Sequence, residues 1–153
     1  MKNEEIIKYA VIGASGYLLY NHFSKVKPSM SPTAFLDKWV SRVGSGDPGT
    51  ITSLYAKDGV LLPTVSSEIA VGKENIRIYF DSFVLQQPSA VIDSLYIRSE
   101  SKGDVVIMDG DYTFTLISEA EEVQVVPARF TFVIKNVKGD WKILTHHSSV
   151  RPV

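Results

Sequence analysis

From Ala90 onward the chain alternates between apolar and polar residues, which is the period of a β-strand. Long alternating runs cover residues 90–99, 105–117, 123–137 and 141–150. Short segments separate them: 101–104 and 138–140 each contain a glycine, and 119–122 is a charged tip. Four consecutive strands joined by such turns predict an antiparallel meander.

The residues before Ala90 repeat their apolar positions at helical spacing. Ser31 suits a helix N-cap and Pro32 the first helical position, so a first helix is expected there. A second, short helix follows Asp47 and Pro48 and includes Tyr55, and a third covers 73–84, with a strand at 60–62 between them. Helices followed by a meander predict an α+β fold, in which about three helices cover one face of a curved antiparallel sheet and enclose a cone.

Composition excludes several classes of function. The chain has 153 residues and a formal net charge of -1, without a basic patch, so nucleic-acid binding is not expected. It has no cysteine, which excludes disulfides, thiolate metal sites and a cysteine nucleophile.

The N-terminal segment differs from the rest. Residues 9–24 carry no formal charge, tyrosines lie near both ends of this run, and Lys25 and Lys27 follow it. We expect a hydrophobic helix over 6–23, within a segment 1–30 that is separate from a domain at 31–153. This helix would be either a membrane anchor, with the domain on the cytoplasmic side, or a packing arm of the domain.

The last strand ends in two histidines and two serines. Strand alternation would place Trp141, Ile143, Thr145, His147 and Ser149 on one face, and Lys142, Leu144, His146 and Ser148 on the other. Because the first face begins with Trp and Ile, we expect it to be the core side. An imidazole and a hydroxyl at the mouth of an apolar pocket are typical of a small-molecule site, although packed or exposed polar residues at a strand end are the simpler alternative.

Five motifs in order resemble one family. They are Leu61-Leu62-Pro63-Thr64-Val65-Ser66, Tyr79-Phe80-x-x-Phe83, Asp111-Tyr112-Thr113-Phe114, Ala128-Arg129-Phe130-Thr131-Phe132-Val133, and Trp141-x-Ile143 with His146-His147-Ser148-Ser149. Together they resemble the iota-class carbonic anhydrases, in the superfamily of the calmodulin-dependent kinase II association domain with its nuclear-transport-factor-like cone fold. The resemblance runs from residue 31 to 153. Thr145 stands where the family usually has a further histidine.

The resemblance implies reversible hydration of carbon dioxide to bicarbonate, with Thr64, Tyr79, His147 and Ser149 as the catalytic residues. It also implies apolar substrate walls from Phe80, Phe83 and Phe130, while Arg129 either holds bicarbonate or pairs within the fold. Members of the class are described as metal-free, and some are reported with manganese.

The sequence favours the metal-free form, without a cofactor. It has three histidines, and His146 and His147 point to opposite faces of one strand, so they cannot share one ion. His147 would then serve as the general base.

Two other functions fit the same fold. A non-catalytic association module or small-ligand binder would not need the hydroxyl groups, and an isomerase or dehydratase would need a deeper pocket for a ring substrate. Apolar residues on both faces of the sheet, such as Val133 opposite Phe132, also predict a homodimer or larger assembly built through the sheet.

Overall fold

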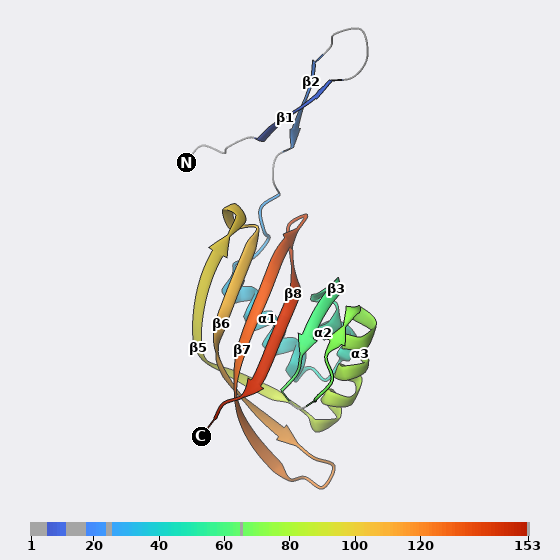
Figure 1. Ribbon diagram of the computed structural model, residues 1–153. Helices are drawn as coiled ribbons and strands as arrows, with labels where there is room; N and C mark the ends of the chain where they lie inside the picture. The colour runs from blue at the N-terminus through green and yellow to red at the C-terminus, as the bar shows by residue number, and fades with distance from the viewer. Residues whose placement is uncertain (1–5, 12–17, 24–25, 65, 153) are drawn as a thin grey trace.

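The computed structural model describes residues 6–11, 18–23, 26–64 and 66–152. It has the α+β fold expected, with a six-stranded sheet in the order β4-β3-β8-β7-β6-β5. The four long strands are β5 (Ser89–Glu100), β6 (Val105–Ile117), β7 (Val123–Val137) and β8 (Asp140–Val150), and they form an antiparallel meander. Figure 1 shows the helices on one side of this sheet.

Two shorter strands extend the sheet beyond β8. Strand β3 (Tyr55–Leu62) pairs with β8 in parallel, and β4 (Ala70–Val71) pairs antiparallel with β3. The sheet is therefore mixed rather than wholly antiparallel. Strand β3 also begins at Tyr55, which the sequence placed in the second helix; Tyr55 instead pairs with Ile143 of β8.

The first two helices begin where their capping residues predict. In α1 (Pro32–Gly44), Ser31 Oγ accepts a 3.1 Å hydrogen bond from the Ala34 amide. Asp47 caps α2 (Pro48–Thr52) by accepting from the amides of Gly49 and Thr50. The third helix, α3, covers Gly72–Phe83, and short 3-10 turns follow at Val84–Gln86 and, after β5, at Ser101–Gly103.

One hydrophobic core lies between the helices and the sheet. The helices bury one face each, α1 through Trp39 and its neighbours and α3 through Ile76, Phe80 and Phe83. Strands β6 and β7 bury their even-numbered residues against them, among which Tyr112, Phe132 and Ile134 are almost fully buried. The far half of the β6–β7 hairpin curves toward α3, and Phe83 contacts Phe114 there with ring centroids 5.7 Å apart (Figure 1).

The helix expected over 6–23 is a wrong prediction where the structure describes that segment. Residues Ile6–Val11 form β1 and Leu18–Phe23 form β2, and the two strands pair antiparallel. The prediction relied on the absence of charge, whereas the isoleucine, valine, tyrosine and phenylalanine residues in these strands favour β structure. The intervening residues 12–17 lie outside the described part.

Within the described segments, no helix is long and apolar enough to cross a membrane. The membrane contact expected for residues 1–30 stays a prediction.

Candidate functional site

A β-bulge in β8 decides which histidine and serine face the core. Ile143 pairs with Ile134 of β7, but the next pair is Thr145 with Val133, so Leu144 is an extra residue on β8. Before the bulge the buried residues are Trp141 and Ile143, and after it they are His146 and Ser148. The expectation that His147 and Ser149 share the core face with Trp141 is therefore wrong.

The core side of the cone holds a small cavity, in which about 20 Å³ is open to the centre of a water-sized sphere. Thr64, just beyond the end of β3, Tyr79 on α3, Tyr112 on β6, and His146 and Ser148 on β8 contribute polar groups to its lining. The remaining lining is apolar: Trp39, Leu61, Pro63, Phe80, Phe83, Phe114, Leu116 and Val126. Elements far apart in the sequence thus contribute to one small cavity.

Three hydroxyl groups meet in this cavity. The Tyr112 hydroxyl donates a 2.5 Å hydrogen bond to Ser148 Oγ, and Ser148 Oγ is in turn hydrogen-bonded to Thr64 Oγ1. Burial raises the pKa of Tyr112 well above its usual value, although the bonds to Ser148 and Thr64 oppose that rise. Tyr112 is therefore a neutral hydrogen-bond donor near neutral pH.

His146 is held at both ring nitrogens. Its Nδ1 lies 2.9 Å from the Tyr55 hydroxyl, and its Nε2 lies 3.2 Å from the Tyr112 hydroxyl. The ring also stacks on Phe132, with centroids 3.9 Å apart. Burial lowers the pKa of His146 to about 3, with a smaller contribution from the charge of His147, so the imidazole is neutral at physiological pH.

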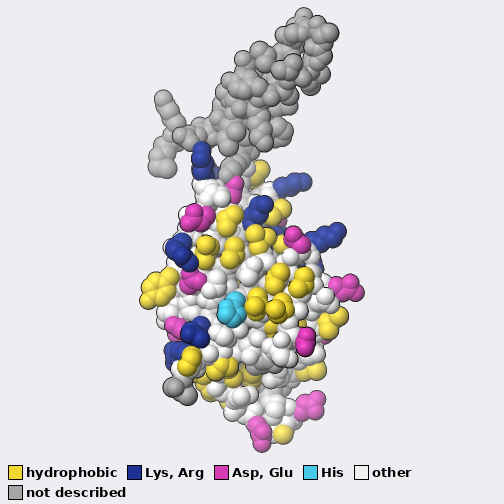
Figure 2. Space-filling view, viewed as in Figure 1, with side chains coloured by type: hydrophobic (Ala, Val, Ile, Leu, Met, Phe, Trp, Pro, Cys, Tyr) yellow, Lys and Arg dark blue, Asp and Glu magenta, His cyan; other side chains and the backbone are white. Residues whose placement is uncertain are grey.

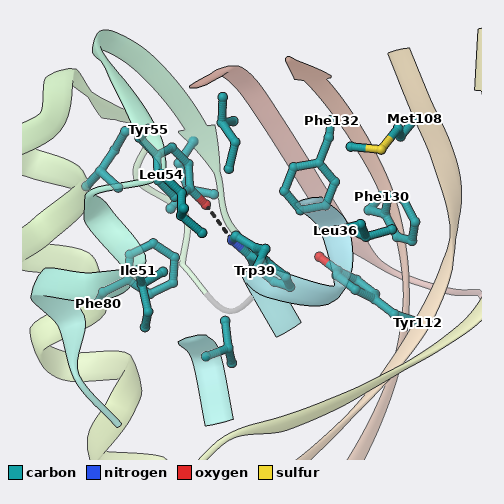
Figure 3. Close-up of a cluster of buried hydrophobic side chains, with 14 of the residues drawn as sticks. Leu36, Trp39, Ile51, Leu54, Tyr55, Phe80, Met108, Tyr112, Phe130 and Phe132 are labelled. Carbon is teal, nitrogen blue, oxygen red and sulfur yellow. Dashed lines mark hydrogen bonds between the residues drawn. The ribbon is translucent and has the colours of Figure 1, made fainter. Parts of the chain in front are cut away.

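The hydrogen bonding continues beyond His146 into the core. Trp39 Nε1 donates to the Tyr55 hydroxyl at 3.3 Å. Figure 3 shows this bond as a dashed line, with the Tyr112 hydroxyl pointing into the same interior. Burial raises the pKa of Tyr55 well above its usual value, so this hydroxyl is also neutral.

Tyr79 forms the outer wall of the cavity. Its ring stacks on Phe83 at 5.5 Å, and it also lines a groove on the outer surface together with Ile69, Ile78 and Gln86. Burial raises the pKa of Tyr79. Tyr79 therefore separates the inner cavity from a groove on the surface.

The structure brings together half of the predicted site residues. Thr64, Tyr79, Phe80 and Phe83 line the cavity.

His147, Ser149 and Arg129 do not join them. These three line a depression on the opposite face of the sheet, because the bulge turns His147 and Ser149 outward and Arg129 follows the outward parity of β7. Phe130 is buried and packs on Tyr112 at 4.9 Å, but it does not line the cavity.

Besides His146 and Ser148, three residues of the hydrogen-bonded network were not predicted as site residues: Trp39, Tyr55 and Tyr112. Tyr112 could have been found, since it shares its strand face with Phe114 and Leu116 and carries the one hydroxyl among them. The sequence placed Tyr55 in the second helix, and Trp39 lies within α1. No local signal in the sequence distinguishes a buried indole that only packs from one that donates a hydrogen bond to a polar network.

A divalent metal does not fit this site. In the part of the chain that the structure describes, no three His, Cys, Asp or Glu side chains are grouped as metal ligands would be. The one histidine of the cavity has both nitrogens engaged by tyrosine hydroxyls.

Known proteins share both this sequence pattern and this fold. A Xanthomonas campestris protein described as a calcium/calmodulin-dependent protein kinase II association domain is 36% identical, with a TM-score of 0.76, over 82% of this chain and 95% of that one. A Salmonella enterica protein of the nuclear transport factor 2-like superfamily is 16% identical, with a TM-score of 0.69, over 79% and 89% of the two chains. A ketosteroid isomerase-like protein from Erwinia carotovora atroseptica is 17% identical, with a TM-score of 0.65, over 79% of this chain and 94% of that one.

The last two likenesses concern the fold alone, and no curated protein matches the chain. The sequence profile of the calcium/calmodulin-dependent protein kinase II association domain matches residues 32–152, which is most of the chain. The protein belongs to the calcium/calmodulin-dependent protein kinase II association domain family.

Proposed function

We propose that this protein is a metal-free carbonic anhydrase of the iota class, which reversibly hydrates carbon dioxide to bicarbonate. The observation that carries the proposal is the water-sized cavity at which Thr64, Tyr112 and Ser148 meet in one hydrogen-bonded cluster. The catalytic set proposed is Thr64, Tyr79, Tyr112 and Ser148, with His146 behind them. His146 and Ser148 replace the His147 and Ser149 of the sequence prediction, because the bulge exchanges the two faces.

The size and walls of the cavity favour a very small, apolar substrate. About 20 Å³ open to the centre of a water-sized sphere leaves room only for molecules of a few atoms, such as water and carbon dioxide. Phe80 and Phe83 provide an apolar wall of the kind that carbon dioxide requires. A ring substrate of the sort an isomerase binds does not fit this volume, which disfavours the deep-pocket alternative.

In the proposed reaction, the oxygen of a bound water attacks the carbon of carbon dioxide. A carbon–oxygen bond forms, one C=O electron pair moves onto oxygen, and the attacking water loses a proton. Tyr79 and the Thr64–Ser148 pair would hold the two reactants in contact, and the pair would donate one hydrogen bond to the oxygen that becomes negative. Tyr112 would support Ser148 through its 2.5 Å bond.

His146 does not suit the role of a general base that the sequence assigned to a histidine. Its lowered pKa, about 3, makes it a weak proton acceptor at pH 7, and each of its nitrogens already has a partner. The proton would therefore leave to solvent or buffer at the cavity mouth. We expect catalysis slower than that of a zinc enzyme, since no cation lowers the pKa of the attacking water.

Stopped-flow measurement of carbon dioxide hydration by the full chain tests the proposal. We expect a rate above buffer that prolonged treatment with chelator leaves unchanged. Ser148→Ala should reduce that rate, and Ser149→Ala, which makes the same deletion on the outer face, serves as the matched control. A rate no greater than buffer would reject the activity, and stoichiometric metal whose removal abolishes the rate would reject the metal-free form.

The family also supports self-association, and we propose a homodimer or larger assembly built through the outer face of the sheet. Figure 2 shows hydrophobic side chains gathered on the sheet face opposite the helices, with charged side chains toward its margins. A non-catalytic association module would keep this surface and would have no use for the hydroxyl cluster. The hydration assay therefore separates the two functions.

A further inference from the structure

An unbroken series of hydrogen bonds runs from the hydrophobic core to the cavity. It begins at Trp39 Nε1, passes through the Tyr55 hydroxyl and both nitrogens of His146, and continues through the Tyr112 hydroxyl to Ser148 and Thr64. Trp39, Tyr55, Tyr112 and His146 are all buried. Solvent therefore does not supply alternative partners along the inner part of this series.

The indole at the start sets the direction of every bond that follows. An indole N–H only donates, so the Tyr55 oxygen accepts from Trp39. The hydrogen of the Tyr55 hydroxyl then needs an acceptor, and within the described chain its remaining partner is His146 Nδ1. Nδ1 of the neutral imidazole therefore carries the lone pair, and the ring proton is on Nε2.

The opposite arrangement leaves a buried group without a partner. With the ring proton on Nδ1, both Trp39 and His146 would donate to the Tyr55 oxygen, and the Tyr55 hydrogen would have no acceptor. The bond between His146 Nε2 and the Tyr112 hydroxyl agrees with a ring proton on Nε2. Nε2–H donates to the Tyr112 oxygen, which leaves the Tyr112 hydrogen for Ser148, as the geometry of that bond has it.

We infer that Trp39 and Tyr55 are positioning residues that hold His146 as its Nε2–H tautomer and thereby direct the hydroxyl hydrogens toward the cavity. Counting the hydroxyl hydrogens of Ser148 and Thr64 shows what this direction means for the cavity. Ser148 accepts from Tyr112, so Ser148 and Thr64 have two hydroxyl hydrogens of their own and only one bond between them. One hydrogen of this pair is not used between them and is available to a molecule in the cavity.

This leftover hydrogen deepens the proposed function, on which its use in catalysis rests. A hydroxyl that must donate suits the oxygen that becomes negative as bicarbonate forms. If every bond ran the other way, Thr64 would donate to Ser148 and Ser148 to Tyr112. The Thr64–Ser148 pair would then offer the cavity only lone pairs. The tautomer of His146 therefore decides whether the Thr64–Ser148 pair is a donor or an acceptor toward the substrate.

Nitrogen NMR of the full-length protein, labelled with ¹⁵N in its histidines, tests the inference without reference to activity. The chain has three histidines, so His22→Gln and His147→Gln proteins identify the His146 signals. We expect His146 at pH 7 to be neutral with its proton on Nε2. In Trp39→Phe the indole donor is lost, the Tyr55 oxygen becomes free to accept from Nδ1, and the Nδ1–H form becomes populated.

The second tryptophan of the chain provides the matched control. Trp141 Nε1 donates to the Met30 carbonyl at 2.9 Å, outside the series, so Trp141→Phe should leave the His146 tautomer unchanged. A wild-type His146 with its proton on Nδ1 would overturn the inference, even where Trp39→Phe does not fold. The same tautomer in wild type and in folded Trp39→Phe would overturn the role of Trp39.

The hydration assay distinguishes this inference from the proposed function. We expect Trp39→Phe to lower the hydration rate about tenfold and Trp141→Phe to leave it unchanged. An Nε2–H tautomer in a protein without hydration activity would reject the proposed function and support the positioning role. Hydration activity with an Nδ1–H tautomer would reject the positioning role alone.

Discussion

The Tyr112 hydroxyl donates to Ser148 Oγ at 2.5 Å, and this bond joins β6 to β8 across the intervening strand β7. Two strands that share no backbone hydrogen bonds are thus linked at the cavity wall. Their side chains meet because the sheet is curved and because both residues point to its core side. The bulge at Leu144 is what gives Ser148 that orientation.

We predict that Tyr112→Phe reduces the hydration rate about 10²-fold, because Ser148 loses the donor that orients it. The change also leaves His146 Nε2–H and Ser148 each short of a partner, which should lower the free energy of unfolding by about 1–3 kcal/mol. Stopped-flow assays and urea denaturation measure the two effects. Tyr96→Phe deletes the hydroxyl of a residue that is 70% exposed on the outer face, and it should change neither. An unchanged rate in Tyr112→Phe would remove Tyr112 from the site.

A second prediction concerns the two neighbouring His–Ser pairs of β8. His146→Gln and Ser148→Ala should each lower the hydration rate by about 10- to 10³-fold, since both residues belong to the cavity. His147→Gln and Ser149→Ala should each stay within about twofold of wild type, since both line the outer face. Circular dichroism should first establish that each variant is folded. The reverse ranking would contradict the register that the bulge gives to β8.

The meander could be predicted from the sequence almost to the residue. Strands β6 and β7 alternate without interruption, and their observed bounds are those expected, Val105–Ile117 and Val123–Val137. Alternation fails only where a strand contains an extra residue. Around the bulge, Leu144 and Thr145 suit either face of a sheet, so nothing in the sequence marks the change of parity before His146.

The candidate site could be predicted only in part, because local sequence patterns do not report contacts between distant residues. Thr64 and Tyr79 were identified through the family resemblance, and the cavity contains both. The network behind His146 depends on contacts across long sequence separations, such as the 91 residues between Tyr55 and His146. Local periodicity carries no information on such contacts, and it also placed Tyr55 in a helix rather than at the start of β3.

The buried histidine predicts how stability depends on pH. Burial lowers the folded pKa of His146 to about 3, whereas the unfolded chain binds a proton there with a pKa near 6.5. The unfolded state therefore gains protonation as the pH falls from about 6.5 toward 3. Over that window the free energy of unfolding should fall by about 1.4 kcal/mol per pH unit for this group alone.

Urea denaturation at several pH values between 7 and 4 measures this slope. His146→Gln should show a shallower slope than wild type, whatever its stability at pH 7. His147→Gln is the control for removal of an imidazole from the exposed face. Equal slopes in wild type and His146→Gln would show that His146 is not held neutral in the folded protein.

Gly110 in β6 allows a close approach between strands, and we predict that Gly110→Ala is destabilising. A Cβ atom there would lie 2.8 Å from Cζ of Phe130 and would also overlap the Ser94 carbonyl of β5. Overpacking of this kind costs about 1–3 kcal/mol. Gly44→Ala is the matched control, because a Cβ at the end of α1 meets no atom within 4 Å and should be neutral or stabilising. Thermal denaturation should therefore show a lower midpoint for Gly110→Ala and an unchanged or higher one for Gly44→Ala, and a stable Gly110→Ala would contradict the packing described.

The last prediction concerns the outer face of the sheet. Ile107 of β6 and Val133 of β7 are cross-strand partners with outward parity, and both are only half-buried in the single chain. A second copy that covers this face would bury both side chains. We therefore expect wild type to be a dimer or larger at micromolar concentration, as measured by light scattering.

Val133→Glu should shift that assembly toward the monomer, because a carboxylate buried between two sheets without a partner is costly. Ile78→Glu makes a comparable change at a residue of α3 that is 59% exposed, away from the sheet, and should leave the mass unchanged. A wild-type protein that is monomeric would refute assembly through this face. Loss of the dimer in Ile78→Glu but not in Val133→Glu would instead place the contact on α3.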